Sequence, residues 1–217
     1  MATFESTVDR VFTSPVYNAE NTLGMIAQVS RGSGLCVGSA DEPGIIESLS
    51  PWETLRRCVL NGHDSVLEFA DLCVFITCPI FVARQLMRYR MASYLERSMR
   101  YAEPIADDCV NPNASAAGIY KEHENECREA YDNFVTLLRQ APEDARAVLP
   151  LSTPTQIVMK ANLREWLHIF EQRLTPNAQE ETRELVQQVY EIAKDEFPVV
   201  MKAWEERNAK GRKNESK

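Results

Sequence analysis

An arginine-rich stretch near the middle of the chain contains the residue types best suited to chemistry. It holds Arg84, Arg88, Arg90, Arg97 and Arg100 within seventeen residues, and no lysine lies among them. Arginine presents a rigid, permanently charged fork of N–H donors that matches a phosphate group. The stretch therefore favours a site for a phosphorylated ligand, although an isolated run of this kind is more typical of a solvated surface.

The composition argues against several classes of function. The 217 residues carry a formal net charge of −8, with 44% hydrophobic and 26% charged residues. A negative chain has no general attraction for nucleic acid or anionic lipid, so any anion site must be local. We find neither a secretory leader nor an apolar run long enough to span a bilayer. We therefore expect a cytoplasmic protein with no membrane segment and no nucleic-acid partner.

The hydrophobic pattern indicates one α/β domain over residues 1–217, with a polar tail from about residue 206 that is expected to fray. Residues rich in Val, Ile, Phe and Leu predict strands at 66–78 and 153–161. The first fifty residues are expected to form strand and loop pieces. Apolar residues three or four apart predict helices at 51–60, 79–88, 116–140 and 163–174, and from 177 onward with a kink at Pro198.

Cysteine and histidine content argues against a disulfide framework and a metal site. The six cysteines form no Cys-x-x-Cys pair, and a chain of this length does not need cross-links to fold. We expect reduced thiols. Three histidines leave few ligands for a histidine metal site, so we predict no metal. The cysteines are Cys36, Cys58, Cys73, Cys78, Cys109 and Cys127.

The arginine-rich stretch resembles the signature of the flavin-dependent thymidylate synthases. That signature is an Arg-His-Arg triplet, then a serine after seven residues, then Arg and Tyr. In this chain the triplet is Arg88-Tyr89-Arg90, the serine is Ser98, and Arg100-Tyr101 closes the motif. The segments 63–68 and 79–85 resemble the upstream segments of the same family.

A second block of residues resembles the C-terminal half of that family in order and spacing. The matched positions lie in 146–150, 162–164 and 178–183, together with His168 and Arg173. The two blocks cover roughly residues 50 to 190. Several separate motifs in register rarely arise by chance, so the resemblance outweighs the interpretation of the arginines as a solvated surface.

The resemblance implies a fold, an activity and a set of partners. The fold is an α+β domain with a mainly antiparallel sheet flanked by helices, assembled as a homotetramer with FAD between subunits. The activity is methylation at C5 of a uridine monophosphate, with no cysteine nucleophile. NADPH reduces the flavin, 5,10-methylenetetrahydrofolate supplies the carbon, and the default substrate is dUMP, giving dTMP.

The resemblance also assigns residues to the cofactor and the nucleotide. Arg173 occupies the catalytic position, where a guanidinium favours ionisation of the uracil N3. The implied flavin contacts are Ser65, Arg88, Tyr89, Arg90, Glu96, Asn162, Arg164 and His168. The implied nucleotide contacts are Gln85, Arg88, Glu96, Ser98, Arg100, Arg173 and, from a neighbouring subunit, Arg146.

Five positions depart from the family pattern. The family has His at position 89, usually His at 69, usually Asn at 95, Gly at 99 and Trp at 180, where this chain has Tyr89, Phe69, Leu95, Met99 and Glu180. A tyrosine keeps a flat ring and a hydroxyl donor but carries no positive charge near neutral pH. Two further functions therefore stay open: the same chemistry on UMP for a modified-nucleoside pathway, and a non-catalytic flavin or nucleotide-binding paralogue.

Overall fold

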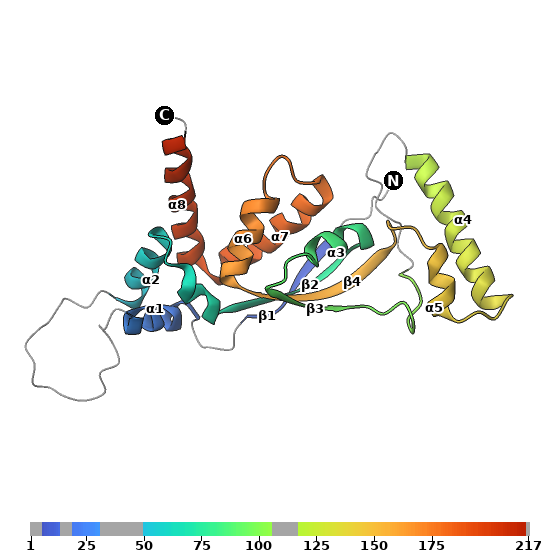
Figure 1. Cartoon of the computed structure of the whole chain (residues 1–217), viewed down its shortest axis with the longest axis horizontal. Coiled ribbons are helices and arrows are strands. Elements are labelled where there is room, and N and C mark those ends of the chain that lie inside the picture. Colours follow the sequence, from blue (N-terminus) through green and yellow to red (C-terminus); the bar gives the residue numbers. More distant parts are fainter. Residues whose placement is uncertain (1–5, 14–18, 31–49, 106–116, 216–217) are drawn as a thin grey trace, which may run out of the picture.

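A four-stranded antiparallel sheet forms the centre of the protein (Figure 1). The computed structural model describes residues 6–13, 19–30, 50–105 and 117–215. The strand order is β1-β2-β4-β3. The strands are β1 (Thr7–Thr13), β2 (Asp71–Pro79), β3 (Ala92–Glu96) and β4 (Pro154–Asn162). The prediction of an antiparallel sheet flanked by helices is confirmed.

Helices pack around the sheet, with α3, α6 and α7 on one side of it and α4 and α5 beyond one end (Figure 1). The shorter elements are the 3-10 helices η1 (Asp64–Phe69) and η3 (Arg146–Val148) and the one-turn helix α5 (Pro142–Ala145). The longer helices are α1 (Ala19–Ser30), α2 (Pro51–Leu60), α3 (Ile80–Leu86), α4 (Ala117–Thr136), α6 (Leu163–Arg173), α7 (Glu180–Glu196) and α8 (Pro198–Glu215).

The two central strands pair over their whole length. β2 and β4 align from Asp71 opposite Asn162 to Pro79 opposite Pro154. Successive side chains of a strand point to opposite faces, so one face collects the residues that form the core. These include Leu72, Val74, Ile76, Ile157 and Met159, all fully or almost fully buried.

Two of the sequence predictions for the N-terminal half were wrong in their extent. Residues 66–69, predicted as the start of a strand, belong to η1, and β2 begins only at Asp71. Val66 and Leu67 are adjacent and both buried in η1, as Leu72, Cys73 and Val74 are in β2, so a short run of apolar residues did not distinguish a helical turn from a buried strand. Helix α1 at 19–30 was also missed, since only strand and loop pieces were expected in the first fifty residues.

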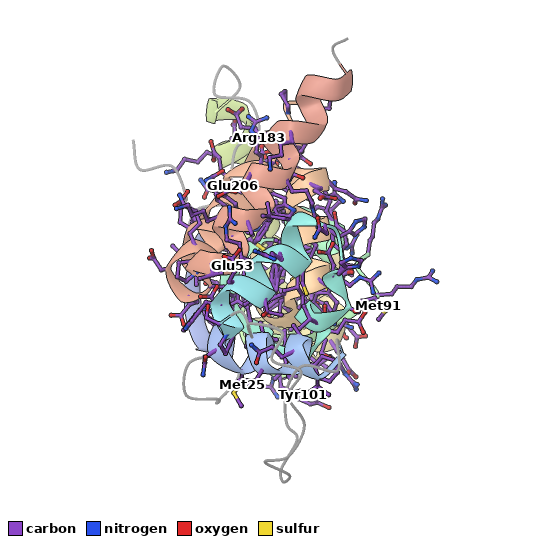
Figure 2. The ribbon with its side chains drawn as sticks, turned by 90° about the vertical axis from the view of Figure 1, so that its left-hand side faces the viewer. Met25, Glu53, Met91, Tyr101, Arg183 and Glu206 are labelled. Atoms are coloured by element: carbon purple, nitrogen blue, oxygen red, sulfur yellow. The ribbon has the colours of Figure 1, made fainter. Side chains whose placement is uncertain are left out.

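The C-terminal half differs from the prediction at Pro198 and at the polar tail. The predicted single kinked helix is two helices, since Phe197 leaves the helical conformation (φ −133°, ψ 58°) and α8 starts at Pro198. The tail stays helical through Glu215. Glu206 accepts from Arg56 of α2 at 2.7 Å, and Arg207 donates to Asp64 at 2.8 Å. Figure 2 shows Glu53 of α2 and Glu206 of α8 on the same side of the molecule.

A buried carboxylate connects the first helix to the last. Glu20 of α1 is 4% exposed and accepts a hydrogen bond from the backbone N–H of Val200 at 2.8 Å, in the first turn of α8. Unpaired N–H groups at a helix start need an acceptor, which explains an acidic side chain at this depth. Burial raises the pKa of Glu20, and the backbone N–H groups of Val200 and Val199 oppose that rise.

This carboxylate predicts a specific pH dependence of stability. A raised folded-state pKa means that the stabilising contribution of the protonated form is full below about pH 4.5 and is lost as the pH rises through the folded-state value. Glu20→Gln keeps the acceptor and removes the titration, so its stability relative to wild type should increase from about pH 4.5 to about pH 7.5. Urea unfolding at both pH values measures the free energy of unfolding of Glu20→Gln minus that of wild type. A difference that stays constant or falls as the pH rises contradicts the prediction.

Glu20→Ala is the matched control. It leaves the N–H groups of Val199 and Val200 without their acceptor, so it should lower the free energy of unfolding by about 1–3 kcal/mol at either pH.

Candidate functional site

Arg173 lies at the centre of a hydrogen-bonded cluster that joins helix α6 to the turn after α3. Its Nε donates to the hydroxyl of Tyr89 at 2.8 Å, and its Cζ lies 5.5 Å from the centroid of the Tyr89 ring. The same hydroxyl donates to Oε1 of Gln172 at 2.9 Å. Tyr89 is 6% exposed, so the phenol holds the guanidinium from the buried side.

Two glutamines and a histidine complete the cluster. Gln85 of α3 accepts from Nη1 of Arg173 at 3.5 Å and donates to Oε1 of Gln179. His168 packs its ring edge to face against Tyr89, at 6.1 Å between centroids, and its Nε2 lies 3.0 Å from Nε2 of Gln172. The structure thus brings together four residues assigned from the sequence: Gln85, Tyr89, His168 and Arg173.

Gln172 and Gln179 were missed as members of this cluster. Gln172 lies one turn after His168 on α6, a spacing that brings two side chains onto one helix face. That spacing was the available signal for Gln172. Gln179 lies just before α7, and only the folded chain shows that it reaches Gln85.

The charge of Arg173 is balanced by no carboxylate within the described part of the chain. Its hydrogen-bond partners there are the neutral side chains of Tyr89 and Gln85. The residue is half-buried and is the last of α6, where the helix dipole favours a cation. A fixed, partly desolvated guanidinium with neutral neighbours is suited to stabilising negative charge on a bound molecule.

A second group of basic residues surrounds Glu143 of α5. Nε of Arg100 lies 2.7 Å from Oε2 of Glu143, and Nε of Arg146 donates to the backbone oxygen of the same residue at 3.1 Å. The backbone N–H of Arg100 donates to Oγ of Ser98 at 3.3 Å. Ser98, Arg100 and Arg146 were assigned to the nucleotide from the sequence, whereas Glu143 was missed. Exposed ion pairs are weak, so an incoming phosphate can replace this carboxylate.

The two outer arginines of the triplet lie at the surface. Arg88 and Arg90 are exposed in the turn before β3, and neither has a hydrogen bond or ion pair to another described residue. Met91 beside them is 70% exposed, and it lies at the edge of the molecule in Figure 2. Exposed donors next to an exposed apolar side chain suit a ligand that is both anionic and aromatic, as a flavin nucleotide is.

The remaining assigned residues already have structural partners or lie exposed. Asn162 caps α6 by accepting from the N–H of Glu165 at 2.9 Å, and Arg164 pairs with Glu68. Glu96 accepts from Oγ1 of Thr155 at 3.0 Å, and Ser65 is exposed in η1. Because η1 packs against α6, these two elements bring Ser65, Arg164 and His168 onto neighbouring surfaces.

Comparison with known proteins places the chain in a family. The model of the thymidylate synthase complementing protein family matches residues 15–199. A flavin-dependent thymidylate synthase of Saccharolobus solfataricus is 38% identical over 162 residues, which cover 72% of this chain and 61% of that protein. One of Pseudothermotoga lettingae is 32% identical over 152 residues, which cover 64% and 68%. The chain belongs to the flavin-dependent thymidylate synthase family.

The family membership confirms the resemblance deduced from the arginine motif, and it implies a flavin cofactor. The chain spans about three fifths of the length of some curated relatives, with 61% for Saccharolobus solfataricus and 60% for Sulfurisphaera tokodaii. A crystal structure of the UMP/dUMP methylase PolB from Streptomyces cacaoi, bound with 5-Br dUMP, superposes with a TM-score of 0.76. It is 23% identical and the match covers 92% of this chain and 94% of that one, so the fold is shared.

The described residues contain neither a cluster of metal ligands nor a helix that could span a membrane. Among the described residues, no three His, Cys, Asp or Glu side chains are grouped to hold a metal ion. None of the helices in those ranges combines the length and apolar character needed to cross a bilayer. The absence of a metal stays a prediction.

The cysteines within the described ranges are free thiols away from the Arg173 cluster. Cys58, Cys73 and Cys78 are buried, and Cys127 is half-buried on α4. Burial, helped by the charge of Glu96, raises the pKa of the Cys78 thiol to about 12. A thiol with that pKa forms almost no thiolate near neutral pH, and the thiolate is the nucleophile. Cys36 and Cys109 lie outside the described residues.

Replacing Cys58, Cys73 and Cys78 one at a time by Ala should therefore leave turnover within about threefold of wild type, while lowering thermal stability through lost packing. Steady-state turnover and thermal unfolding of each flavin-loaded variant measure the two effects. A variant that folds and binds flavin normally but loses about 100-fold in kcat would assign a nucleophile that this interpretation lacks.

Proposed function

We propose that the chain methylates C5 of a uridine monophosphate, with dUMP as substrate and dTMP as product. The observation that carries the proposal is Arg173, a half-buried guanidinium held by neutral groups, in a chain of the flavin-dependent thymidylate synthase family. The bound FAD, reduced by NADPH, would supply the reducing equivalents that turn the methylene of 5,10-methylenetetrahydrofolate into a methyl group.

Arg173 would act on the uracil ring. C5 of uracil becomes nucleophilic when negative charge builds up on the ring, and a fixed donor at the ring edge lowers the energy of that state. Arginine stays protonated throughout the neutral range, so it can provide this donor without its own titration. Because the Nε–H is occupied by Tyr89 and one N–H of Nη1 is directed at Gln85, the remaining terminal N–H groups are the ones left for the ring.

The phosphate of the nucleotide would bind to the second basic group. Arg100 and Arg146 converge on Glu143, and Ser98 adds a hydroxyl. A phosphate dianion presents more acceptor oxygens than a carboxylate and would displace the Glu143 carboxylate from the guanidinium of Arg100. Gln85 and Arg88 would contact the same nucleotide closer to its base, and Glu96 lies at the end of β3 between the two groups.

The two groups of one chain lie at opposite ends of β3, which supports a site shared between subunits. Tyr89 precedes the strand and Arg100 follows it, and the five strand residues alone cover about 16 Å. We propose that a complete site takes the ring-binding group from one copy and part of the phosphate-binding group, including Arg146, from another. A homotetramer, the assembly that the resemblance implies, would provide this.

The flavin would lie against residues of η1, α6 and the turn before β3. The exposed members of the assigned set are Ser65, Arg88, Arg90, Glu96, Arg164 and His168, and these would contact it directly. Tyr89 would support the contact surface from the buried side, and Asn162 would fix the start of α6.

UMP is the second candidate substrate. The fold neighbour from Streptomyces cacaoi is named a UMP/dUMP methylase, so the fold accommodates both nucleotides in that protein. A single ribose hydroxyl is discriminated by the polar groups that face it, and the assigned residues address the phosphate and the base. Retention of the 2′-OH would place the product in modified-nucleoside synthesis.

A turnover assay with each nucleotide separates these functions. The protein with FAD, NADPH and 5,10-methylenetetrahydrofolate should convert dUMP to dTMP, and the ratio of kcat/KM for dUMP and UMP identifies the preferred substrate. A higher kcat/KM for UMP than for dUMP would show that UMP, and not dUMP, is the preferred substrate. Binding of flavin without turnover of either nucleotide would leave the non-catalytic paralogue as the function.

Arg173→Ala and Arg100→Ala should have different kinetic effects. Loss of one preorganised donor to a developing anion costs about 3–4 kcal/mol, so Arg173→Ala should lower kcat roughly 100- to 1,000-fold while flavin binding stays nearly intact. Arg173→Lys should rescue part of this, since lysine keeps the charge and loses the planar fork. Arg100→Ala should mainly raise KM for the nucleotide, so its defect shrinks at saturation.

The measurement is kcat at saturating nucleotide for both variants. Near wild-type kcat in Arg173→Ala, together with a large loss in Arg100→Ala, would show that the roles of ring and phosphate have been assigned the wrong way round.

A further inference from the structure

Tyr89 occupies the position at which the family signature has histidine, and its side chain points into the protein. It is 6% exposed and belongs to the hydrophobic core, whereas Arg88 and Arg90 on either side are exposed. A residue that turns inward between two outward-facing arginines has a task different from theirs. We propose that Tyr89 is a positioning residue, whose hydroxyl fixes the guanidinium of Arg173 in the orientation that the reaction needs.

The contacts of the hydroxyl carry this inference. Its oxygen accepts from Nε of Arg173 at 2.8 Å, and its proton goes to Oε1 of Gln172 at 2.9 Å. Gln172 and Arg173 are consecutive on α6, so one oxygen atom is fixed to two neighbouring side chains at the end of that helix. The ring also lies beneath the guanidinium, with 5.5 Å between Cζ and the ring centroid. These contacts restrict both the position and the rotation of the guanidinium.

The turn that carries Tyr89 is itself held in place. The hydroxyl of Tyr94 on β3 lies 2.7 Å from the backbone oxygen of Leu86 and 2.9 Å from that of Tyr89. The N–H of Tyr89 donates to the oxygen of Leu86 at 3.1 Å. The edge-to-face packing of His168 against the ring holds the other side. The phenol is therefore a rigid support for Arg173, set by the end of α3, by β3 and by α6.

A phenol suits this task because its one oxygen accepts and donates at the same time. Burial raises the pKa of the Tyr89 hydroxyl, against the opposing effect of the Arg173 charge. The hydroxyl keeps its proton near neutral pH, so the bond to Gln172 and the bond from Arg173 coexist. An arginine without such contacts samples many rotamers. Because Arg173 is already fixed in the folded protein, its side chain loses less conformational entropy when the nucleotide binds.

The inference rests on the proposed function for the task of Arg173, and Tyr89→Phe tests it. Phenylalanine keeps the ring and its packing and removes only the hydroxyl. We expect kcat at saturating nucleotide to fall about 10- to 100-fold, because a small misplacement of a catalytic group has an effect of that size. KM for the nucleotide and flavin binding should change less than threefold. Tyr190→Phe is the matched control, since it also loses one tyrosine hydroxyl bond, to Glu205, and should keep kcat.

A double-mutant cycle separates positioning from general damage. In the Arg173→Ala background, Tyr89→Phe should lower kcat by less than about twofold, because the group that the hydroxyl positions is gone. Midpoints of thermal unfolding for wild type, Tyr89→Phe, Arg173→Ala and the double variant give a second cycle, which needs no turnover. Its shifts should also be non-additive, since the two residues share one hydrogen bond.

The outcomes distinguish this inference from the proposed function. Wild-type kcat in Tyr89→Phe, or equal kcat losses from Tyr89→Phe with and without Arg173, would overturn the positioning role while leaving the proposed function standing. If the wild-type protein turns over neither dUMP nor UMP, the proposed function falls, and the unfolding cycle decides whether the hydroxyl is coupled to Arg173. Additive unfolding shifts in that case would overturn the inference as well.

Discussion

The register between β2 and β4 is the constraint on which the rest of the structure depends. Asp71 lies opposite Asn162 at one end of the ladder, and Pro79 lies opposite Pro154 at the other. Helix α3 leaves β2 directly at the second end, and α6 leaves β4 directly at the first. The two helices therefore start at opposite ends of the sheet, and their C-terminal residues meet where Arg173 contacts Gln85. A register shift of one residue would move the buried side chains of one strand to the opposite face of the sheet and displace the helix that follows it, which would separate these groups.

The two arginine groups differ in how their charge is balanced, and this difference supports the proposal that one binds the uracil ring and the other the phosphate. Arg173 is held by neutral groups on rigid elements, so its position is set before any ligand arrives. Arg100 is paired with an exposed carboxylate that a stronger anion can replace. In a chain with a net charge of −8, the proposed binding of an anionic nucleotide would depend on such local arrangements.

The sequence predicted the two central strands, most helices and the family, because these depend on local composition and periodicity and on motifs in register, whereas the short strand β3 was missed. It assigned Gln85 and Arg173 to the nucleotide and Tyr89 and His168 to the flavin, and the structure brings all four together. The sequence did not predict that the side chain of Tyr89 points into the core, since this orientation depends on the packing of α3, β3 and α6 together. Glu143 and Gln179 were missed for the same reason: each reaches its partner only through long-range contacts.

Under the proposed function, Arg173 stabilises negative charge on the uracil ring. The most direct measurement is the pKa of the ring N3–H of bound dUMP, followed by the 13C chemical shift of labelled C4 as the pH is raised. We expect a pKa below that of free dUMP in the wild-type protein, and a return toward the free value in Arg173→Ala with the nucleotide still bound. The same ring pKa in both proteins would contradict it.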